Sequence, residues 1–167
     1  MRLVMADEHH LPGMLACIEA ARAYFKEKQI PQWQSNHYPG RADLCADIAK
    51  KNAYVVIEAD QVIATAAIQF TQDPNYDKID GAWICDGKYA VIHRIAVLPK
   101  WKGQQAAALF VAFAKEKGKT IGCKSLRIDT HCQNIAMIRF IEKCGYRYCG
   151  VVVVGDGTKR NAYELPL

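Results

Sequence analysis

Apolar residues in the first part of the chain show two patterns, a helical spacing and continuous runs. From Leu11 to Phe25 they return every three or four positions, which predicts an amphipathic helix. Tyr54–Glu58 and Val62–Gln69 are continuous apolar runs rich in β-branched residues and separated by three residues, a pattern typical of a β-hairpin. We also expect a strand at Leu3–Met5 and a short helix at Ala42–Lys50.

The second part of the chain begins with an irregular stretch and then alternates between strands and helices. Thr71–Lys88 is polar and aromatic without a regular period, which predicts an excursion over the surface. Tyr89–Val97 is the longest predicted strand, and Pro99 ends it because proline cannot donate to a sheet ladder. Further helices are predicted at Ala106–Lys117 and Asn134–Lys143, and strands at Ser125–Asp129, Tyr146–Val154 and Ala162–Leu165.

These elements follow the order β-α-α-β-β-β-α-β-α-β-β, without an internal repeat or a linker. A chain of 167 residues fits one domain. We therefore predict a single α/β (α+β) domain over residues 1–167. Its mixed, mostly antiparallel sheet has about six to seven strands and about four flanking helices.

Composition indicates the cellular compartment and argues against a membrane protein and a metal-binding protein. Hydrophobic residues make up 51% and charged residues 23%, and no apolar run approaches the ~20 residues that span a bilayer. The first residues lack an export signal, so we expect a cytoplasmic protein without a membrane partner. The seven cysteines include no CxxC pair, which favours reduced thiols, several of them in the core (Cys17, Cys45 and Cys85), over a metal site.

The net charge of +5 is spread along the chain. Because there is no basic stripe interleaved with aromatic residues, we expect no nucleic-acid partner. A mild positive excess suits a small polyanionic ligand.

The turn after the longest strand carries the main candidate chemistry. Residues Pro99–Gln105 connect this strand to a helix that opens with three alanines, Ala106–Ala108. A helix N-terminus binds anions through its free N–H groups and its dipole, and Gly103 permits a tight turn. Pyrophosphate is the expected guest, although many such turns bind nothing.

The run His93–Ala107 resembles motif A of the GNAT N-acetyltransferase superfamily, in which a strand leads through a V-x-P element and a glycine-containing turn into a helix. Leu126–Thr130, Asn134 and Lys143–Tyr146 resemble the second half of that family in the right order. The resemblance covers nearly the whole chain, with the specific motifs between Tyr89 and Tyr146.

This resemblance implies acetyl-CoA as the co-substrate. Main-chain groups of Ile95, Ala96 and Val97 would bind the pantetheine arm and polarise the thioester carbonyl, at a bulge that splays this strand from the next. Lys102 occupies the family's Arg/Gln position, and Asn134 matches an asparagine on the cofactor side. The implied cofactor-binding residues are Ile95, Ala96, Val97, Lys102, Gly103, Gln104, Gln105, Ala106, Ala107 and Asn134.

Two residues depart from the family pattern. Gln105 replaces a glycine, and it would be strained if the turn requires a positive φ there. Ile141 replaces a tyrosine that many members use to protonate the leaving thiolate. Substitute donors remain open among Tyr146, Tyr163, His131 and Cys144.

The proton acceptor and the acceptor pocket are also predicted from the pattern. Asp129 is the candidate general base, with a loop-capping role as its alternative. His93 is a second candidate, although a histidine at such a position is more often a half-buried structural residue. For the acceptor pocket we consider Trp33, Tyr38 and Trp83; the two tryptophans could instead cover the core edge.

The sequence therefore predicts an N-acetyltransferase that moves an acetyl group to a primary amine by direct attack in a ternary complex. The acceptor, a small molecule or a peptide, is not identified by the sequence. The alternative is a non-catalytic CoA-binding or interaction module on the same fold. A homodimer is compatible with exposed sheet edges.

Overall fold

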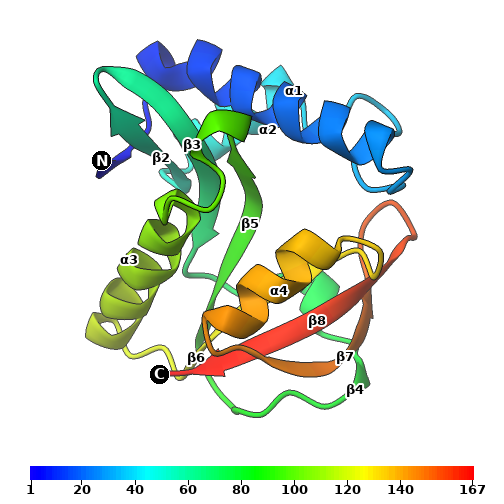
Figure 1. Cartoon of the computed structure of the whole chain (residues 1–167). Helices are drawn as coiled ribbons and strands as arrows, with labels where there is room; N and C mark the ends of the chain where they lie inside the picture. Colours follow the sequence, from blue (N-terminus) through cyan, green and yellow to red (C-terminus); the bar gives the residue numbers. More distant parts are fainter. The chain divides into compact units, whose positions relative to one another are not determined.

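The computed structural model describes residues 1–167 (Figure 1). It contains four α-helices, which are α1 (Leu11–Glu27), α2 (Arg41–Ala49), α3 (Ala106–Thr120) and α4 (Ile135–Lys143). The strands are β1 (Arg2–Met5), β2 (Ala53–Glu58), β3 (Gln61–Gln69), β4 (Asp80–Gly81), β5 (Tyr89–Val97), β6 (Ser125–Thr130), β7 (Arg147–Val153) and β8 (Lys159–Pro166). Short 3-10 turns are η1 (Glu8–His10), η2 (Pro74–Tyr76) and η3 (Pro99–Trp101).

The predicted mixed, mostly antiparallel α/β fold is confirmed. The strands follow the order β1-β2-β3-β5-β6-β8-β7-β4, and β5 pairs in parallel with β6 over Tyr89–Val91. The sheet has eight strands rather than six to seven. The additional strand is β4, whose two residues pair with Val151 and Gly150 of β7. Two residues are too few to produce a hydrophobic period, so the sequence pattern could not reveal this strand.

The chain divides into two compact units, and the prediction of one domain over residues 1–167 stays a prediction. Unit 1 comprises Met1–Ile68 and His93–Val111, and unit 2 comprises Gln69–Ile92 and Ala112–Leu167. None of the helices combines the length and hydrophobicity needed to cross a membrane.

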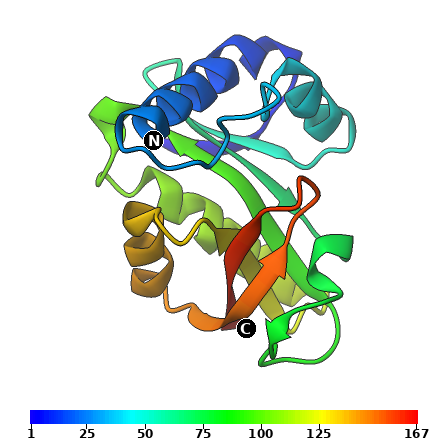
Figure 2. The same cartoon turned by 90° about the vertical axis from the view of Figure 1, so that its right-hand side faces the viewer.

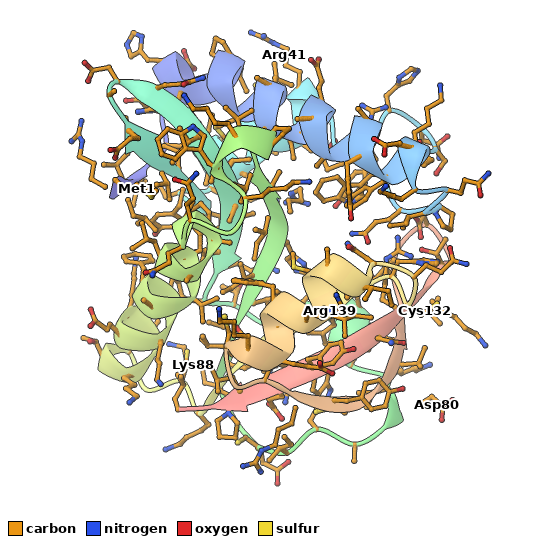
Figure 3. All side chains as sticks on the ribbon, viewed as in Figure 1. Met1, Arg41, Asp80, Lys88, Cys132 and Arg139 are labelled. Atoms are coloured by element: carbon orange, nitrogen blue, oxygen red, sulfur yellow. The ribbon has the colours of Figure 1, made fainter.

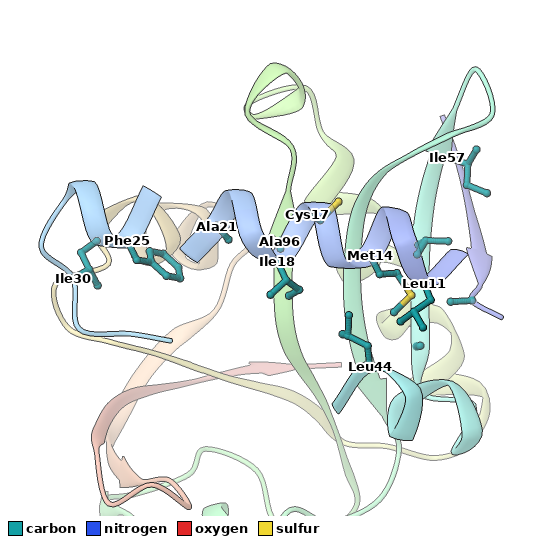
Figure 4. Packing of buried hydrophobic residues seen from close by; sticks show 13 residues of the cluster. Leu11, Met14, Cys17, Ile18, Ala21, Phe25, Ile30, Leu44, Ile57 and Ala96 are labelled. Carbon is teal, nitrogen blue, oxygen red and sulfur yellow. The ribbon is translucent and has the colours of Figure 1, made fainter. Parts of the chain in front are cut away.

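The core of unit 1 lies under the apolar face of α1 (Figure 4). The three/four spacing of that face turns one row of side chains toward the strands. Gly13 permits a close approach, because a Cβ at that position would lie 2.6 Å from the Cβ of Val62 on β3. The buried members of this cluster include Leu11, Met14, Cys17, Ile18, Ala21 and Phe25 of α1, Leu44 of α2, and Ala53, Val55 and Ile57 of β2.

Unit 2 is built on the antiparallel strands β6, β8 and β7 (Figure 2). In the register, Ile128 of β6 and Tyr148 of β7 both face Tyr163 of β8. A small aromatic and aliphatic cluster packs there, formed by Tyr76, Tyr89, Val91, Val152 and Ala162. The predicted excursion thus supplies Tyr76 to a core, because aromatic side chains bury large areas even from an irregular segment.

Candidate donor site and acceptor-side residues

The end of β5 departs from regular strand geometry at one residue. Arg94 has a φ of +55°, in the left-handed region that non-glycine residues rarely adopt. His93, Arg94 and Ile95 are all half-buried, so the alternation expected for this strand is interrupted. Beyond them Ala96 is buried, and the N–H of Leu98 donates to the carbonyl of Ile63 at 2.9 Å. Residues 95–97 therefore follow directly on a distorted point in the strand.

The turn between β5 and α3 contains two residues with positive φ. Gly103 has a φ of +78°, and a Cβ there would meet no atom within 4 Å, so only its backbone conformation favours glycine. Gln105 has a φ of +66°. The turn thus requires the conformation for which glycine is suited at the position where this chain carries glutamine.

Four N–H groups at the start of α3 are without a main-chain acceptor, those of Gly103, Gln105, Ala106 and Ala107. The N–H of Gln104 instead donates to Trp101 at 3.3 Å, so this predicted donor is already engaged. Helical bonding begins at Ala108, whose N–H donates to Gln105 at 2.9 Å. Unpaired N–H groups and the positive end of the helix dipole together favour an anion at this turn.

Lysine side chains add positive charge to the turn. The ammonium of Lys102 lies 3.8 Å from the ring centroid of Tyr24 on α1, a cation–π contact. Burial lowers the pKa of Lys102, and Glu27 opposes that shift. Lys100 lies 5.7 Å from the ring centroid of Trp101.

Asn134 and Asp129, which belong to unit 2, have clear local partners. Asn134 is buried and caps α4, since its Oδ1 accepts from the N–H of Met137 at 3.3 Å. The carboxylate of Asp129 accepts a 2.6 Å hydrogen bond from the Tyr76 hydroxyl. Burial, followed by the Asp129 charge, raises the pKa of Tyr76 well above its usual value. Tyr76 therefore stays protonated and keeps donating to Asp129.

The position of the missing tyrosine lies in the protein interior. Ile141 is fully buried on α4. Of the substitute donors, Tyr146 has a buried hydroxyl without a hydrogen-bond partner, and burial raises its pKa. Burial also raises the pKa of Tyr163 and of Cys144, whereas it lowers the pKa of His131, with Arg160 contributing. The raised pKa values make the two tyrosines and Cys144 weaker proton donors, and the lowered pKa of His131 reduces the fraction of its protonated form at neutral pH.

The three aromatic residues considered for the acceptor pocket are placed differently. Trp33 packs edge-on against Phe25, with ring centroids 5.4 Å apart, and the indole N–H of Trp83 donates to the carbonyl of Tyr76 at 3.1 Å. Both tryptophans thus contact buried residues of their own unit, and their role in an acceptor pocket stays a prediction. Tyr38 is exposed, and its hydroxyl accepts from Arg94 at 2.8 Å.

Two arginine–carboxylate pairs were not predicted from the sequence. Arg94 pairs with Asp47 of α2, and Arg127 pairs with Glu164. The partners are 47 and 37 positions apart. The positions of Asp47 and Glu164 on predicted elements were the only available signal, and spacing cannot pair residues so distant in sequence.

All seven cysteines are free thiols. Cys17 is buried as expected, but Cys45 is exposed and Cys85 is half-buried, so the prediction that both lie in the core was wrong. Cys45 lies on the outward side of α2, which the apolar content of its neighbourhood did not reveal. Cys132, labelled in Figure 3, is exposed in the connection between β6 and α4. No three His, Cys, Asp or Glu side chains gather as ligands for a metal ion.

The sequence matches the acetyltransferase (GNAT) family over residues 16–146. This chain belongs to that family. An acetyltransferase of the GNAT family from Streptococcus agalactiae is 31% identical, with a TM-score of 0.86 over 99% of this chain and 95% of the other. Both halves of the predicted motif lie within the matched range, so the family resemblance read from them is confirmed.

Two more distant structures share the fold. One is an acetyltransferase of the GNAT family from Listeria monocytogenes, at 17% identity and a TM-score of 0.72, covering 99% of this chain and 94% of the other. The second is the PaiA N-acetyltransferase from Thermoplasma acidophilum in complex with coenzyme A, at 14% identity and a TM-score of 0.73, covering 99% and 98%. No protein of curated function matches the sequence.

Proposed function

We propose that this acetyltransferase is a cytoplasmic, acetyl-CoA-dependent N-acetyltransferase that acts on a primary amine by direct attack in a ternary complex. The observation that carries the proposal is the group of four unpaired N–H groups at Gly103, Gln105, Ala106 and Ala107. They open a helix directly after the strand that bears the family motif, and such N-termini favour phosphate groups. The seven free thiols support a reducing compartment.

In the proposed reaction the amine nitrogen attacks the thioester carbonyl of acetyl-CoA. An N–C bond forms, the C–S bond breaks, and CoA leaves as a thiolate. Main-chain groups of residues 95–97 would stabilise the negative charge on the carbonyl oxygen. Asp129 or His93 would take the proton that the amine loses, directly or through water.

The leaving thiolate does not require a dedicated acid. With a thiol pKa of ~8.5, expelling the thiolate at neutral pH costs about 2 kcal/mol relative to the thiol. This cost is small compared with the barrier reduction that enzymes supply, ~8 kcal/mol or more. Turnover is therefore compatible with isoleucine at position 141.

The test is an acetylation assay with a panel of primary amines: spermidine, an aminoglycoside, a peptide with a free N-terminus and an N-terminally blocked lysine peptide. Because the protein has seven free cysteines, loss of thioester absorbance and mass spectrometry of the product should replace thiol reagents. We expect an amide product from at least one amine and none from the matching alcohols. Binding of acetyl-CoA without turnover of any amine would favour the non-catalytic module instead.

The role of Asp129 is tested with Asp129→Asn, which keeps its size and its contact with Tyr76. General-base catalysis contributes typically ~10²–10⁴-fold, so kcat should fall by about that factor without loss of acetyl-CoA binding. Asp156→Asn, in the exposed β7–β8 turn, is the matched control.

A homodimer is also proposed, and light scattering of the purified protein tests it.

A further inference from the structure

Arg94 is held by every nitrogen of its guanidinium. Nε and Nη2 donate to the two carboxylate oxygens of Asp47 at 2.9 and 2.6 Å, and Nη1 donates to the Tyr38 hydroxyl at 2.8 Å. The Asp47 side chain is only 9% exposed. An arginine is suited to this arrangement because its planar fork offers donors in fixed directions, whereas a lysine ammonium cannot reproduce it.

These contacts join three segments of unit 1. Arg94 lies on β5 immediately before residues 95–97, and Asp47 lies on α2, whose first residue Arg41 is labelled in Figure 3. Tyr38 belongs to the irregular segment 31–40, which connects α1 to α2 and also carries Trp33. The positive φ of Arg94 makes the backbone conformation at this point dependent on surrounding contacts.

Segment 31–40 has further contacts within unit 1, since Trp33 packs against Phe25 and the N–H of Gly40 donates to the carboxylate of Asp43 at 2.8 Å. The amide of Gln34 donates to the carbonyl of Arg22 at 3.1 Å, and the N–H of Tyr38 donates to Ser35 within the segment. Tyr38 itself is 39% exposed, and its hydroxyl uses a lone pair for Arg94, which leaves its own proton for another acceptor. Tyr38 thus contacts Arg94 of the donor strand through its hydroxyl and through its ring, whose centroid lies 5.9 Å from the guanidinium carbon.

We propose that Arg94 is a positioning residue for acetyl transfer, which, anchored on Asp47, holds Tyr38 and segment 31–40 in register with the main chain of residues 95–97. The inference rests on the proposed function, in which residues 95–97 bind the thioester, and it adds acceptor binding by the segment that carries Tyr38. Binding of CoA at residues 95–97 would then change the conformation of segment 31–40 before any amine binds.

The experiment uses the three tryptophans of the chain as reporters. Labelling with 5-fluorotryptophan gives separate fluorine resonances for Trp33, Trp83 and Trp101, assigned by Trp→Phe replacement. Trp101 lies in η3 after β5 and reports CoA at the turn, whereas Trp33 lies in segment 31–40. On titration with CoA, we expect both the Trp101 and the Trp33 signals of the wild type to shift.

Tyr38→Phe removes one exposed oxygen and so does not threaten folding. It should leave the Trp101 shift and the CoA affinity unchanged while the Trp33 signal stays near its unliganded position. Arg94→Lys should do the same. Tyr148→Phe, the same change at an exposed tyrosine of β7, is the matched control and should behave as the wild type.

Kinetics with the best amine of the panel provide a second readout. Loss of one hydrogen bond corresponds to roughly 2–10-fold, so Tyr38→Phe should raise the KM for the amine by about that factor. The KM for acetyl-CoA should stay unchanged. A merely structural role would raise both constants or neither.

The outcomes separate the two proposals. If CoA shifts Trp101 but not Trp33 in the wild type, or if Tyr38→Phe retains the full Trp33 shift, the positioning role of Arg94 is overturned while the proposed function stands. If the wild type binds no CoA, both fall together.

Discussion

The two arginine–carboxylate pairs of this protein look alike in composition and differ in nearly everything else. In unit 2, Glu164 is completely buried and accepts from the side chains of Ser125 and Arg127 and from the N–H groups of Ile84 and Cys85. In unit 1, the side chain of Arg94 is 20% exposed and ends on the exposed Tyr38.

Their surroundings differ as well. The guanidinium of Arg127 lies between aromatic rings, 4.0 Å from the centroid of Trp83 and 3.8 Å from that of Tyr89. Arg127 lies on the regular strand β6 and donates to the carbonyl of Cys85 at 3.1 Å. Together with the bonds from Ile84 and Cys85 to Glu164, this contact fixes part of the excursion to the sheet. Arg94 instead has a positive φ at the end of β5. Both guanidinium groups are hydrogen-bonded, so the pairs differ in burial and in backbone geometry. A fully buried carboxylate on regular strands favours a structural role, whereas the positive φ and partial exposure of Arg94 motivate the positioning role proposed above.

The largest expected effect comes from breaking the structural pair. Glu164→Gln leaves the buried charge of Arg127 without its counter-ion, and such losses cost about 3–5 kcal/mol. We expect the free energy of unfolding, measured by urea denaturation, to fall by about 3 kcal/mol. Glu142→Gln, on the exposed side of α4, should change it by no more than ~0.5 kcal/mol. A loss below ~1 kcal/mol for Glu164→Gln would contradict the structural role.

A smaller loss is expected when the family's tyrosine is restored. Ile141→Tyr places a larger side chain in a fully buried position, and overpacking costs about 1–3 kcal/mol. The Tm should fall and kcat should not rise. An unchanged Tm with a clear increase in kcat would show that the hydroxyl reaches the leaving group, against this account.

The turn before α3 should respond in opposite directions to two exchanges. Gly103→Ala introduces a side chain at a φ of +78° without a clash and should destabilise by about 1 kcal/mol, whereas Gln105→Gly relieves a φ of +66° and should stabilise by up to ~1 kcal/mol. Denaturant midpoints of the two variants check the signs. Equal signs would mean that the turn does not hold these conformations.

The smallest effect at neutral pH concerns Cys17 in the core of unit 1. Burial raises its pKa from 9.0 to about 12, against a hydrogen bond from the Leu98 backbone. The folded state therefore favours the thiol, and this contribution is complete below pH 9.0 and is lost as the pH rises toward 12. Between pH 9.0 and 12, the free energy of unfolding, measured by urea denaturation, should fall less steeply with pH in Cys17→Ala than in the wild type.

Alkylation distinguishes the buried thiol of Cys17 from the exposed thiols. Iodoacetamide at pH 8 should modify the exposed Cys45 and Cys132 first, as read by peptide mass spectrometry, and leave Cys17 unmodified. Early modification of Cys17 in the folded protein would contradict its burial.

Much of the fold could be predicted from the sequence because its elements have long hydrophobic periods. Residues 11–25 and 89–97 each carry enough repeats to define a helix and a strand. The turn between β5 and α3 could also be predicted, because proline ends a strand at Pro99 and glycine permits a tight turn at Gly103. The pairs of Arg94 and Arg127 could not be predicted, because contacts between residues 47 and 37 positions apart depend on tertiary packing.

The proposed function requires the start of α3 to bind the pyrophosphate of acetyl-CoA. Ala107→Glu places a carboxylate among the unpaired N–H groups, where it favours the helix dipole but repels the ligand. Ala112→Glu is the same exchange on an exposed position of the same helix, about 7.5 Å further along its axis.

Isothermal titration with acetyl-CoA is the most direct measurement. We expect sub-millimolar binding by the wild type and by Ala112→Glu, and affinity at least ~10-fold weaker for Ala107→Glu, about 1.4 kcal/mol, without loss of Tm. Equal affinities of the two variants, or no binding by the wild type near millimolar concentration, would contradict it.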